Sequence, residues 1–411
     1  MPNANDAAAD EAARLAANAV DSLPVGTLAQ KLRDAQREGR QLRVKLGIDP
    51  TAPDIHLGHA VVLGKLRAFQ DAGHRVVLIV GDYTARVGDP SGRSSLRPML
   101  SPQEIDANAA TFQEQALKVL DANPERLEVR RNSEWLDMPM AEMLKLVGTT
   151  TAAQLLERDD FAKRWSANEP ISMLELMYPL LQGYDSVAID ADVELGGTDQ
   201  KFNLLLGRDI QRAYGKPQQA VLTMPILVGV DGHQKMSKSL GNQIGVTDAP
   251  QQMYGKTMSI PDEALGEYYR LLIDARAPSD GGGPSATDAR DGLSARDAKR
   301  ALAQRLVAWL HSEAAAAAAE SHFDRVFVQR GVPEQIEDAH FDCSEGMVHL
   351  PGLIAQEFGV SRSEARRMID QGGVSLGEIP VLAGSHDVPC EQADGQILKV
   401  GKRRFRRLHA R

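Results

Sequence analysis

The stretch LRVKLGIDPTAPDIHLGHAVVLGKLRAFQDAGHRVVLIV, residues 42–80, decides the fold of this chain. Its two ends, 42–48 and 75–80, are short apolar runs that predict strands. Between them, a Pro-containing loop over 49–55 leads into an amphipathic stretch over 58–72, which predicts a helix. Strand, helix and strand in this order form a βαβ unit. We therefore expect an α/β domain with a parallel sheet and with ligands at the carboxyl ends of its strands.

Size and charge narrow the class of protein without giving its function. The 411 residues suggest two or three domains, and 43% hydrophobic with 25% charged residues is typical of a globular protein. The net charge of -9 argues against a surface that binds nucleic acid all over. Residues 347–411, however, hold 10 Lys and Arg against 7 Asp and Glu, so the basic part lies at the end of the chain.

Three sequence features bear on the compartment. No apolar run approaches the ~20 residues that cross a bilayer, so we expect no membrane contact. Residues 7–20 are rich in alanine and carry acidic residues, which predicts a short surface helix and not an export signal. Cys343 and Cys390 are too few for a disulfide framework and wrongly spaced for a zinc site, so we expect two reduced thiols and no structural metal. These expectations fit a cytoplasmic enzyme.

Composition and periodicity divide the chain into parts. We predict an N-terminal helical segment over 1–40, a catalytic domain over 41–245, a helical domain over 246–340 and a small domain over 347–411. The catalytic domain carries a helical insertion at about 130–180. Within the helical domain, residues 276–296 are rich in Gly, Ser, Asp and Ala without apolar periodicity, so we expect a flexible connector there.

Two short motifs have the chemistry of a nucleotide site. His56-Leu57-Gly58-His59 stands where the loop gives way to a helix, so backbone N–H groups there can meet phosphates while both imidazoles face one cleft. Lys235-Met236-Ser237-Lys238-Ser239 follows the apolar run 220–230, which predicts a strand, and its two lysines can wrap a triphosphate. Alone, the first motif is more often a packed or surface pair of histidines, and the second a solvated loop. Together, and in this order, they are far more specific.

The two motifs resemble the HxGH and KMSKS signatures of the class I aminoacyl-tRNA synthetases. The resemblance implies a doubly wound, Rossmann-like catalytic domain that forms an aminoacyl-adenylate from ATP, with Mg²⁺ on the phosphates. Neither a P-loop motif nor a GxGxxG after a strand is present, which disfavours those alternatives. The catalytic residues that the resemblance implies are Thr51, His56, His59, Lys235 and Lys238. The ATP-binding residues that it implies are Gly47, Asp49, His56, Gly58, His59, Gly197, Asp199, Lys235, Met236, Ser237, Lys238 and Ser239.

Further segments extend the resemblance to the tyrosyl-tRNA synthetase family. They are residues 47–52, 88–92, 178–185 and 196–200. Tyr178, Gln182 and Asp185 have the spacing i, i+4, i+7, which places them on one helix face. Taken alone, such a face also fits an ordinary amphipathic helix. The resemblance implies that Asp185 accepts a hydrogen bond from the substrate phenol. It assigns L-tyrosine binding to Thr84, Asp89, Tyr178, Gln182, Asp185 and Gln200.

One position departs from the pattern of this family. Many bacterial members have a tyrosine two residues before the glycine of the first strand, where it assists recognition of the phenol, but this chain has Lys45. Two interpretations stay open, a role in the pocket and a lysine at the edge of a strand. Recognition of the phenol therefore rests more heavily on Asp185.

The C-terminal part resembles the alpha-L RNA-binding module. The sequence suggests two short helices over 348–357 and 361–372, with Ser361 as the N-cap of the second, followed by a small β-rich part. The resemblance implies a small α+β domain that contacts tRNA phosphates. The residues that would make these contacts are Arg362, Arg366, Arg367, Lys402, Arg403 and Arg404. A solvated basic tail is the alternative.

The resemblance as a whole implies an enzyme that activates L-tyrosine with ATP, releases pyrophosphate and transfers the tyrosyl group to the 3′ end of tRNA(Tyr). It also implies a homodimer built on the helical insertion. Three other interpretations stay open: a tryptophan-specific member of the class, another adenylate-forming nucleotidyltransferase, and a noncatalytic RNA-binding protein with the same fold. The complete lysine motif argues against the last of these.

Overall fold

The computed structural model describes residues 4–50, 54–90, 101–274, 294–328, 336–343, 346–377, 379–401 and 404–411. Thr51, Lys402, Arg403 and most of the predicted connector, residues 276–293, lie outside the described residues. The chain forms two compact units, Met1–Ala316 and Ala317–Arg411. No helix in the described part of the chain is both long and apolar enough to cross a membrane.

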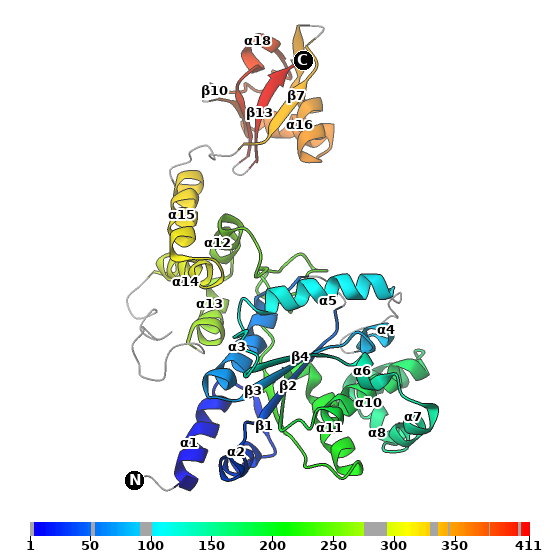
Figure 1. The fold of residues 1–411 in the computed structure, drawn as a ribbon. Coiled ribbons are helices and arrows are strands. Elements are labelled where there is room, and N and C mark those ends of the chain that lie inside the picture. Colours follow the sequence, from blue (N-terminus) through cyan, green and yellow to red (C-terminus); the bar gives the residue numbers. More distant parts are fainter. Residues whose placement is uncertain are drawn as a thin grey trace. The chain divides into compact units, whose positions relative to one another are not determined.

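Unit 1 is built on a six-stranded sheet in the order β1-β6-β5-β2-β3-β4 (Figure 1). The strands are β1 (Asp21–Leu23), β2 (Arg43–Ile48), β3 (Arg75–Val80), β4 (Leu127–Arg131), β5 (Val193–Gly197) and β6 (Ala220–Met224). β1 pairs antiparallel with β6, and all other neighbours are parallel. The chain runs outward from β2 to β3 and β4, then returns to β5 and β6. This reversal between β2 and β5 confirms the predicted doubly wound α/β fold and marks the usual ligand site of such folds.

The predicted βαβ unit is present, because its apolar runs suit a sheet that is covered on both faces. β2 and β3 pair in register from Arg43 with Arg75 to Ile48 with Val80. All of β3 after Arg75 is buried, as expected for parallel strands under helices. Helix α3 (Leu57–Asp71) joins the two strands and buries an apolar face.

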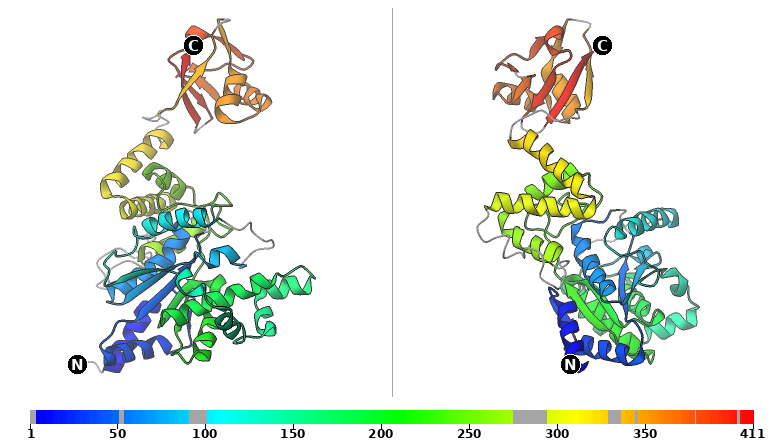
Figure 2. Two further views of the ribbon diagram at one scale, coloured as in Figure 1. Left: turned by 45° about the vertical axis from the view of Figure 1, so that its right-hand side comes forward. Right: turned by 60° about the vertical axis from the view of Figure 1, so that its left-hand side comes forward.

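Most of the remaining helices of unit 1 lie beside the sheet, and those that follow β6 form a group to one side of it (Figures 1 and 2). Before and between the early strands lie α1 (Ala4–Ala16), α2 (Thr27–Glu38), α4 (Thr84–Val87) and α5 (Pro102–Ala116). The insertion contains α6 (Ser133–Leu136), α7 (Met140–Val147), α8 (Ala152–Leu156), α9 (Asp159–Ser166) and α10 (Met173–Ala188). After β5 come η1 (Thr198–Gln200), α11 (Lys201–Ala213), α12 (Pro250–Met258), η2 (Asp262–Ala264), α13 (Leu265–Tyr268), η3 (Tyr269–Ile273), α14 (Ala295–Leu310) and α15 (Glu313–Phe323), which runs into unit 2 and continues as η5 (Asp324–Val328).

Helices α10 and α11 pack closely against each other, and α10 carries the residues predicted to bind tyrosine. The side chain of Ser172, the N-cap of α10, accepts from the backbone N–H of Leu174, which satisfies an otherwise free donor of the first turn. A Cβ atom at Gly183 would lie only 3.2 Å from the Cα of Gly207 on α11. Two glycines, Gly183 and Gly207, therefore let the backbones of the two helices approach.

Two predicted boundaries differ from the structure. The apolar run 220–230 is a strand only as far as Met224, because Pro225 has no N–H for the ladder. The last residues of the predicted connector, 295 and 296, belong to α14. That helix begins where the hydroxyl oxygen of Ser294 accepts from the backbone N–H of Asp297, so a side-chain cap starts the helix inside a segment of low apolar content.

Unit 2 is a small α+β domain with a five-stranded sheet in the order β10-β9-β12-β13-β7 and a two-stranded sheet, β11-β8. Its strands are β7 (Asp338–Phe341), β8 (Met347–His349), β9 (Val374–Leu376), β10 (Ile379–Pro380), β11 (Asp387–Pro389), β12 (Ile397–Val400) and β13 (Arg404–Ala410). Its helices are α16 (Leu350–Phe358), α17 (Arg362–Asp370) and α18 (Cys390–Ala393). The oxygen of Ser361 accepts from the N–H of Glu364 at 3.1 Å, which confirms the predicted N-cap of α17.

The expectation of two reduced thiols is wrong for this structure. Cys343 and Cys390 form a disulfide within unit 2, with their Cα atoms 6.0 Å apart. Cys343 follows β7 and Cys390 begins α18, and both pack against the apolar core of the unit. The fold thus brings together two cysteines that are 47 residues apart in sequence, a proximity that their spacing does not reveal.

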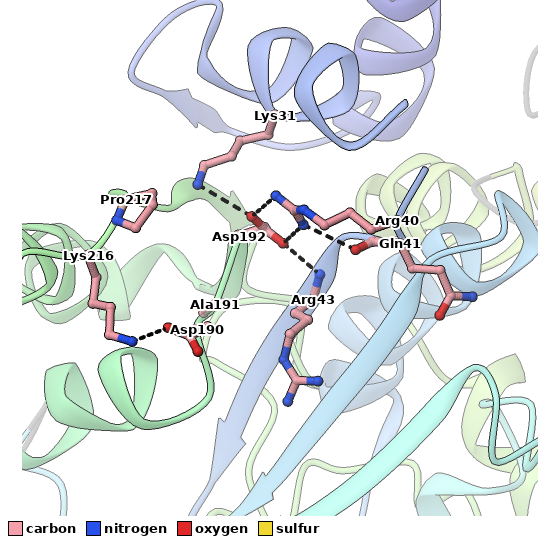
Figure 3. A pocket seen from close by; sticks show the side chains of 9 residues that line it. All are labelled: Lys31, Arg40, Gln41, Arg43, Asp190, Ala191, Asp192, Lys216 and Pro217. Carbon is pink, nitrogen blue, oxygen red and sulfur yellow. Dashed lines mark hydrogen bonds and ion pairs between the residues drawn. The ribbon is translucent and has the colours of Figure 1, made fainter. Parts of the chain in front are cut away.

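At the amino ends of β2 and β5, an ion network lines a pocket of about 310 Å³ (Figure 3). Asp192 lies at its centre. Its carboxylate accepts two hydrogen bonds from Arg40, at 2.7 and 3.1 Å, one from Lys31 at 3.4 Å and one from the backbone N–H of Arg43 at 3.0 Å. Every cation that lines this pocket is paired with a carboxylate. The network therefore links α2 to the sheet, at the edge opposite the switch-point crevice.

Replacing the central carboxylate tests this link. We expect Asp192→Asn to lower the free energy of unfolding by about 2 kcal/mol or more, because Lys31 and Arg40 lose their shared counter-charge. The matched control is Asp190→Asn, which removes an exposed pair with Lys216 and should cost about 0.5 kcal/mol or less. Urea unfolding followed by circular dichroism measures both variants, and equal losses would contradict a supporting role of Asp192.

Candidate active site

The two predicted nucleotide motifs meet at the carboxyl edge of the sheet. His56 immediately precedes α3, and the lysine motif follows β6 in sequence. The backbone N–H of Leu57 donates to the carbonyl of Ile244 at 2.9 Å, and His56 forms a β-bridge with Gly245. The segment after the lysine motif is thus paired with the start of α3, so residues far apart in sequence share one site.

The two histidines of the first motif stack on each other. Their ring centroids are 3.9 Å apart, and the backbone N–H of His56 donates to Nδ1 of His59 at 3.3 Å. A Cβ atom at Gly58 would lie 2.9 Å from Nδ1 of His56. Position 58 therefore requires glycine because a side chain there would collide with the imidazole of His56, whether or not a ligand is bound.

Burial keeps both imidazoles neutral. It lowers the pKa of His56 to about 2 and that of His59 to about 4, and the ammonium of Lys235 acts in the same direction on both. His56 is only 8% exposed, and its Nδ1 has no hydrogen-bond partner among the described residues. A buried polar atom without a partner is costly, so His56 is prepared to bond a ligand in this site.

The lysine motif is held by its backbone, while both lysine side chains reach carboxylates. Met236 is 1% exposed, and its N–H donates to the carbonyl of Leu227 at 3.0 Å. Lys235 pairs with Asp199, directly after β5, and Lys238 pairs with Asp54, just before α3. Both ammonium groups thus bond carboxylates at the carboxyl edge of the sheet, and both lysine side chains are exposed.

Thr84 on α4 and Tyr178 on α10 both bond the carboxylate of Asp49, which follows β2. Its Oδ1 accepts from the hydroxyl of Thr84 at 2.6 Å and its Oδ2 from the hydroxyl of Tyr178 at 2.9 Å. Burial raises the pKa of Asp49, and the nearby Asp89 adds to this shift. Asp49, predicted to serve ATP, is therefore bonded to two residues predicted to serve tyrosine, and it lies where the two sites adjoin.

A second group of hydrogen bonds joins the other predicted tyrosine-binding residues. Gln200 donates to Oδ2 of Asp89 at 2.8 Å. Nδ2 of Asn203 donates to the side-chain oxygens of Gln182, at 2.9 Å, and Gln200, at 3.1 Å. Asn203 was not predicted from the sequence. It lies on α11 and sets the orientation of two amide side chains that come from different elements.

Asp185 is a buried acceptor among the residues predicted to bind tyrosine. It is 3% exposed, and its Oδ1 accepts from the indole N–H of Trp135 at 2.8 Å. Asn132 lies 3.5 Å from its Oδ2 and also donates to Thr84 at 3.0 Å. Burial raises the pKa of Asp185 to about 6, and Lys45 and these two donors oppose that shift. A carboxylate offers about four lone-pair positions, so Asp185 has capacity for a further donor.

Sequence reasoning missed Asn132, Trp135 and Arg158. Asn132 directly follows β4, at the same edge of the sheet as the other site residues, and that position is its sequence signal. Arg158, from the insertion, donates to Oδ1 of Asn203 at 3.2 Å and lies 3.7 Å from Asp89. All three come from the segment predicted only as a helical insertion.

Lys45 does not lie at an edge of the sheet, so that interpretation is wrong. Its strand, β2, is flanked by β5 and β3. The physical reason is the strand order, which places the first strand of a doubly wound sheet in the interior.

The residues predicted to bind tRNA belong to unit 2. Arg362, Arg366 and Arg367 are exposed on α17, and Arg404 is exposed at the start of β13. The described residues contain no group of three His, Cys, Asp or Glu side chains that could hold a metal ion.

Comparisons of the sequence with known proteins agree with this geometry. The tyrosine–tRNA ligase of Moorella thermoacetica is 50% identical over 394 residues, which are 94% of this chain and 92% of that protein. The tyrosine–tRNA ligase of Thermotoga maritima is 48% identical, over 95% of each chain.

Solved structures share the fold. The tyrosyl-tRNA synthetase of Archaeoglobus fulgidus, solved in complex with L-tyrosine, has a TM-score of 0.61 and 25% identity, and the match covers 76% of this chain and 99% of that one. The C-terminally truncated mitochondrial tyrosyl-tRNA synthetase of Aspergillus nidulans has a TM-score of 0.63 at 20% identity, over 80% and 95% of the two chains. The family model for class I tRNA synthetases (W and Y) matches residues 37–328. This chain therefore belongs to the class I tRNA synthetases (W and Y), and among them to the tyrosine–tRNA ligases.

Proposed function

We propose that this protein activates L-tyrosine with ATP, releases pyrophosphate and transfers the tyrosyl group to the 3′ end of tRNA(Tyr). One observation carries the proposal. The hydrogen bonds at Asp49 join Tyr178, on the predicted amino-acid face of α10, to the end of β2, next to the HxGH motif. An amino-acid carboxylate held there would lie beside the α-phosphate of a nucleotide bound at the switch point.

The chemistry needs no protein nucleophile. The tyrosine carboxylate attacks the α-phosphorus, pyrophosphate leaves, and negative charge grows on the phosphoryl oxygens. We assign the stabilisation of that charge to His56, Lys235 and Lys238; the unpartnered Nδ1 of His56 and the exposed lysine side chains support this assignment. We assign Asp199 to the ATP ribose, and we assign Mg²⁺ to the triphosphate as part of the substrate. Thr51 is assigned to the phosphates from the motif alone.

The family also includes tryptophan enzymes. The buried carboxylate of Asp185 accepts the indole N–H of Trp135 and has capacity for a phenolic O–H as well. The choice of tyrosine over tryptophan rests on the sequence identity of about half to tyrosine–tRNA ligases.

Pyrophosphate exchange with each of the twenty amino acids tests the activity and its substrate. We expect exchange with tyrosine to exceed that with phenylalanine at least about 10–100-fold, because phenylalanine leaves the buried Asp185 acceptor unpaired. Exchange that favours tryptophan would assign the chain to the other branch of the family. A lack of exchange with every amino acid would overturn the proposed activation step.

The lysine motif can be tested separately from substrate binding. We expect Lys238→Ala to slow adenylate formation about 100-fold or more, since its ammonium acts on charge that develops in the transition state. The KM for tyrosine should change little in comparison. Lys216→Ala, which removes a paired lysine at the opposite edge of the sheet, is the matched control. Stopped-flow measurement of adenylate formation gives both quantities, and equal losses in rate and tyrosine affinity would contradict this role.

We further propose that unit 2 contacts the tRNA backbone. The exposed arginines of α17 form one basic surface, and Arg404 and Arg407 are exposed on β13. Arg406 is instead paired with Glu357 and Glu337. Lys402 and Arg403, which we also assign to tRNA binding, lie outside the described residues.

Replacing three arginines of α17 tests the tRNA assignment. We expect the combined change Arg362→Ala, Arg366→Ala and Arg367→Ala to weaken tRNA binding about 10-fold or more and to lower its salt dependence by roughly two to three counterions. Tyrosine-dependent pyrophosphate exchange should be unchanged. The combined change Arg37→Ala and Arg212→Ala, at exposed sites of unit 1, is the control. Filter binding at several salt concentrations measures the effect, and unchanged tRNA affinity would overturn the assignment.

We also propose that the protein works in the cytoplasm as a homodimer. Large apolar side chains are exposed on three helices of the insertion: Met140 and Leu144 on α7, Trp165 on α9, and Met173 and Leu174 on α10. Contiguous exposed apolar surface marks interaction sites, and a second copy of the chain would cover it. A molar mass of one chain by light scattering would overturn this proposal. The cytoplasm is where the charged tRNA is used in translation.

A further inference from the structure

Lys45 is a fully buried lysine beneath the amino-acid pocket. Its side chain is 0% exposed. Its Nζ donates to the carbonyl oxygen of Gln182 and to the hydroxyl of Ser186, both at 2.8 Å, and lies 2.7 Å from Oε1 of Glu194. The three N–H groups of the ammonium therefore each have an acceptor. A lysine is almost never buried to this extent unless it is paired, so the partners explain how this one is tolerated.

These contacts connect Lys45 to one turn of α10. Gln182 and Ser186 lie one helical turn apart, and Asp185 lies between them in sequence. The ammonium thus bonds the same turn that presents Gln182 and Asp185 to the pocket. A shift of this turn would move two of the proposed tyrosine contacts at once.

Glu194 completes the cluster from the neighbouring strand. It is 1% exposed and lies opposite Lys45 in the register of β5 against β2. Its Oε2 accepts from the hydroxyl of Ser186 at 3.1 Å and from the side-chain amide of Gln219. Glu194 therefore keeps hydrogen-bond donors of its own, apart from its ion pair with Lys45.

The charge at Asp185 depends on the groups that face it from several elements. These groups are Lys45 on β2, Glu194 on β5, Asp49 at the end of β2 and Tyr178 on α10. Burial and Glu194 raise the pKa of Asp185, and Lys45 lowers it. Burial raises the pKa of Tyr178 well above its usual value, so this phenol stays neutral. The cation at Lys45 therefore offsets the buried anionic charge beside Asp185.

We propose that Lys45 is a specificity-determining positioning residue for tyrosine: it fixes the α10 turn that carries Gln182 and Asp185, and it keeps the Asp185 carboxyl in the ionised form that accepts a phenolic hydrogen bond. The inference rests on the proposed function and deepens it. The arrangement of Lys45, the α10 turn and Asp185 selects an aromatic amino acid with a hydroxyl donor at the far end of its ring.

Two substitutions with opposite charge effects test the proposal. Lys45→Met removes the cation, so the pKa of Asp185 rises and the acid limb of kcat/KM for tyrosine moves to higher pH, by about one pH unit. Glu194→Gln removes the anion and keeps the shape of the side chain, while its amide NH2 replaces one acceptor oxygen with a donor. In this variant the pKa of Asp185 falls, and the acid limb of kcat/KM for tyrosine moves to lower pH by about half a pH unit. Pyrophosphate exchange between pH 5 and 8, with tyrosine varied at saturating ATP, measures both shifts.

A purely structural ion pair would give another result. Both substitutions break the same pair, so loss of structure alone would lower activity in both variants and leave the acid limb unmoved. The proposal is overturned if the acid limbs of both variants move in the same direction, or if neither limb moves. Asp49 also has a raised pKa, chiefly from its burial, and neither Lys45 nor Glu194 is among the causes of its shift. The direct effect of either substitution on Asp49 should therefore be small.

Two controls separate the possible failures. The profile of kcat/KM for ATP, at saturating tyrosine, should keep its wild-type shape in both variants. If Lys45→Met does not fold, Glu194→Gln decides alone: a limb at lower pH supports the proposal, and an unmoved or raised limb overturns it. A wild-type protein that does not exchange with tyrosine overturns the proposed function itself, whereas unmoved limbs in variants of a tyrosine-active protein overturn only the role of Lys45.

Discussion

The short pairing between β2 and β5 is the constraint on which the site depends. These strands pair over only two residue positions, Val44 with Val193 and Lys45 with Glu194, whereas β2 pairs with β3 over six. Beyond Lys45 and Glu194 the strands separate, because the chain leaves β2 toward α3 and leaves β5 toward α11, on either side of the switch point. Lys45 and Glu194 are thus the last paired residues of these two strands, and Lys45 bonds the turn of α10 that carries Gln182 and Asp185.

Two kinds of electrostatic environment lie close together at the carboxyl ends of the strands. The imidazoles of the HxGH motif are neutral and buried, so they act as hydrogen-bonding groups and leave the positive charge to the lysines. The carboxylates of Asp49 and Asp185 are buried, and hydrogen bonds from Thr84, Tyr178 and Trp135 stabilise them. A substrate with an ammonium and a hydroxyl fits the second environment, and a polyphosphate fits the first. This division allows one crevice to bind a cationic group and a polyanion side by side.

Much of this arrangement could be predicted from the sequence, because its signals are local. The βαβ unit follows from apolar runs of strand length, and the face of α10 follows from helical spacing. The partners of these residues could not be predicted in the same way. Trp135 and Asn203 have no local pattern, because only the packing of α6 and α11 brings them to the pocket. Glu194 becomes the partner of Lys45 only through the register of two strands, and the disulfide of unit 2 depends in the same way on three-dimensional proximity.

The ion pairs of the lysine motif have a consequence for how binding energy is used. Both ammonium groups have carboxylate partners, Asp199 and Asp54. A triphosphate that binds these lysines, as we propose, has to replace these partners, so much of its attraction to the lysines is spent on the exchange and little appears as ground-state affinity. Further attraction arises as negative charge forms on the departing pyrophosphate. Such a loop would favour turnover over tight retention of nucleotide.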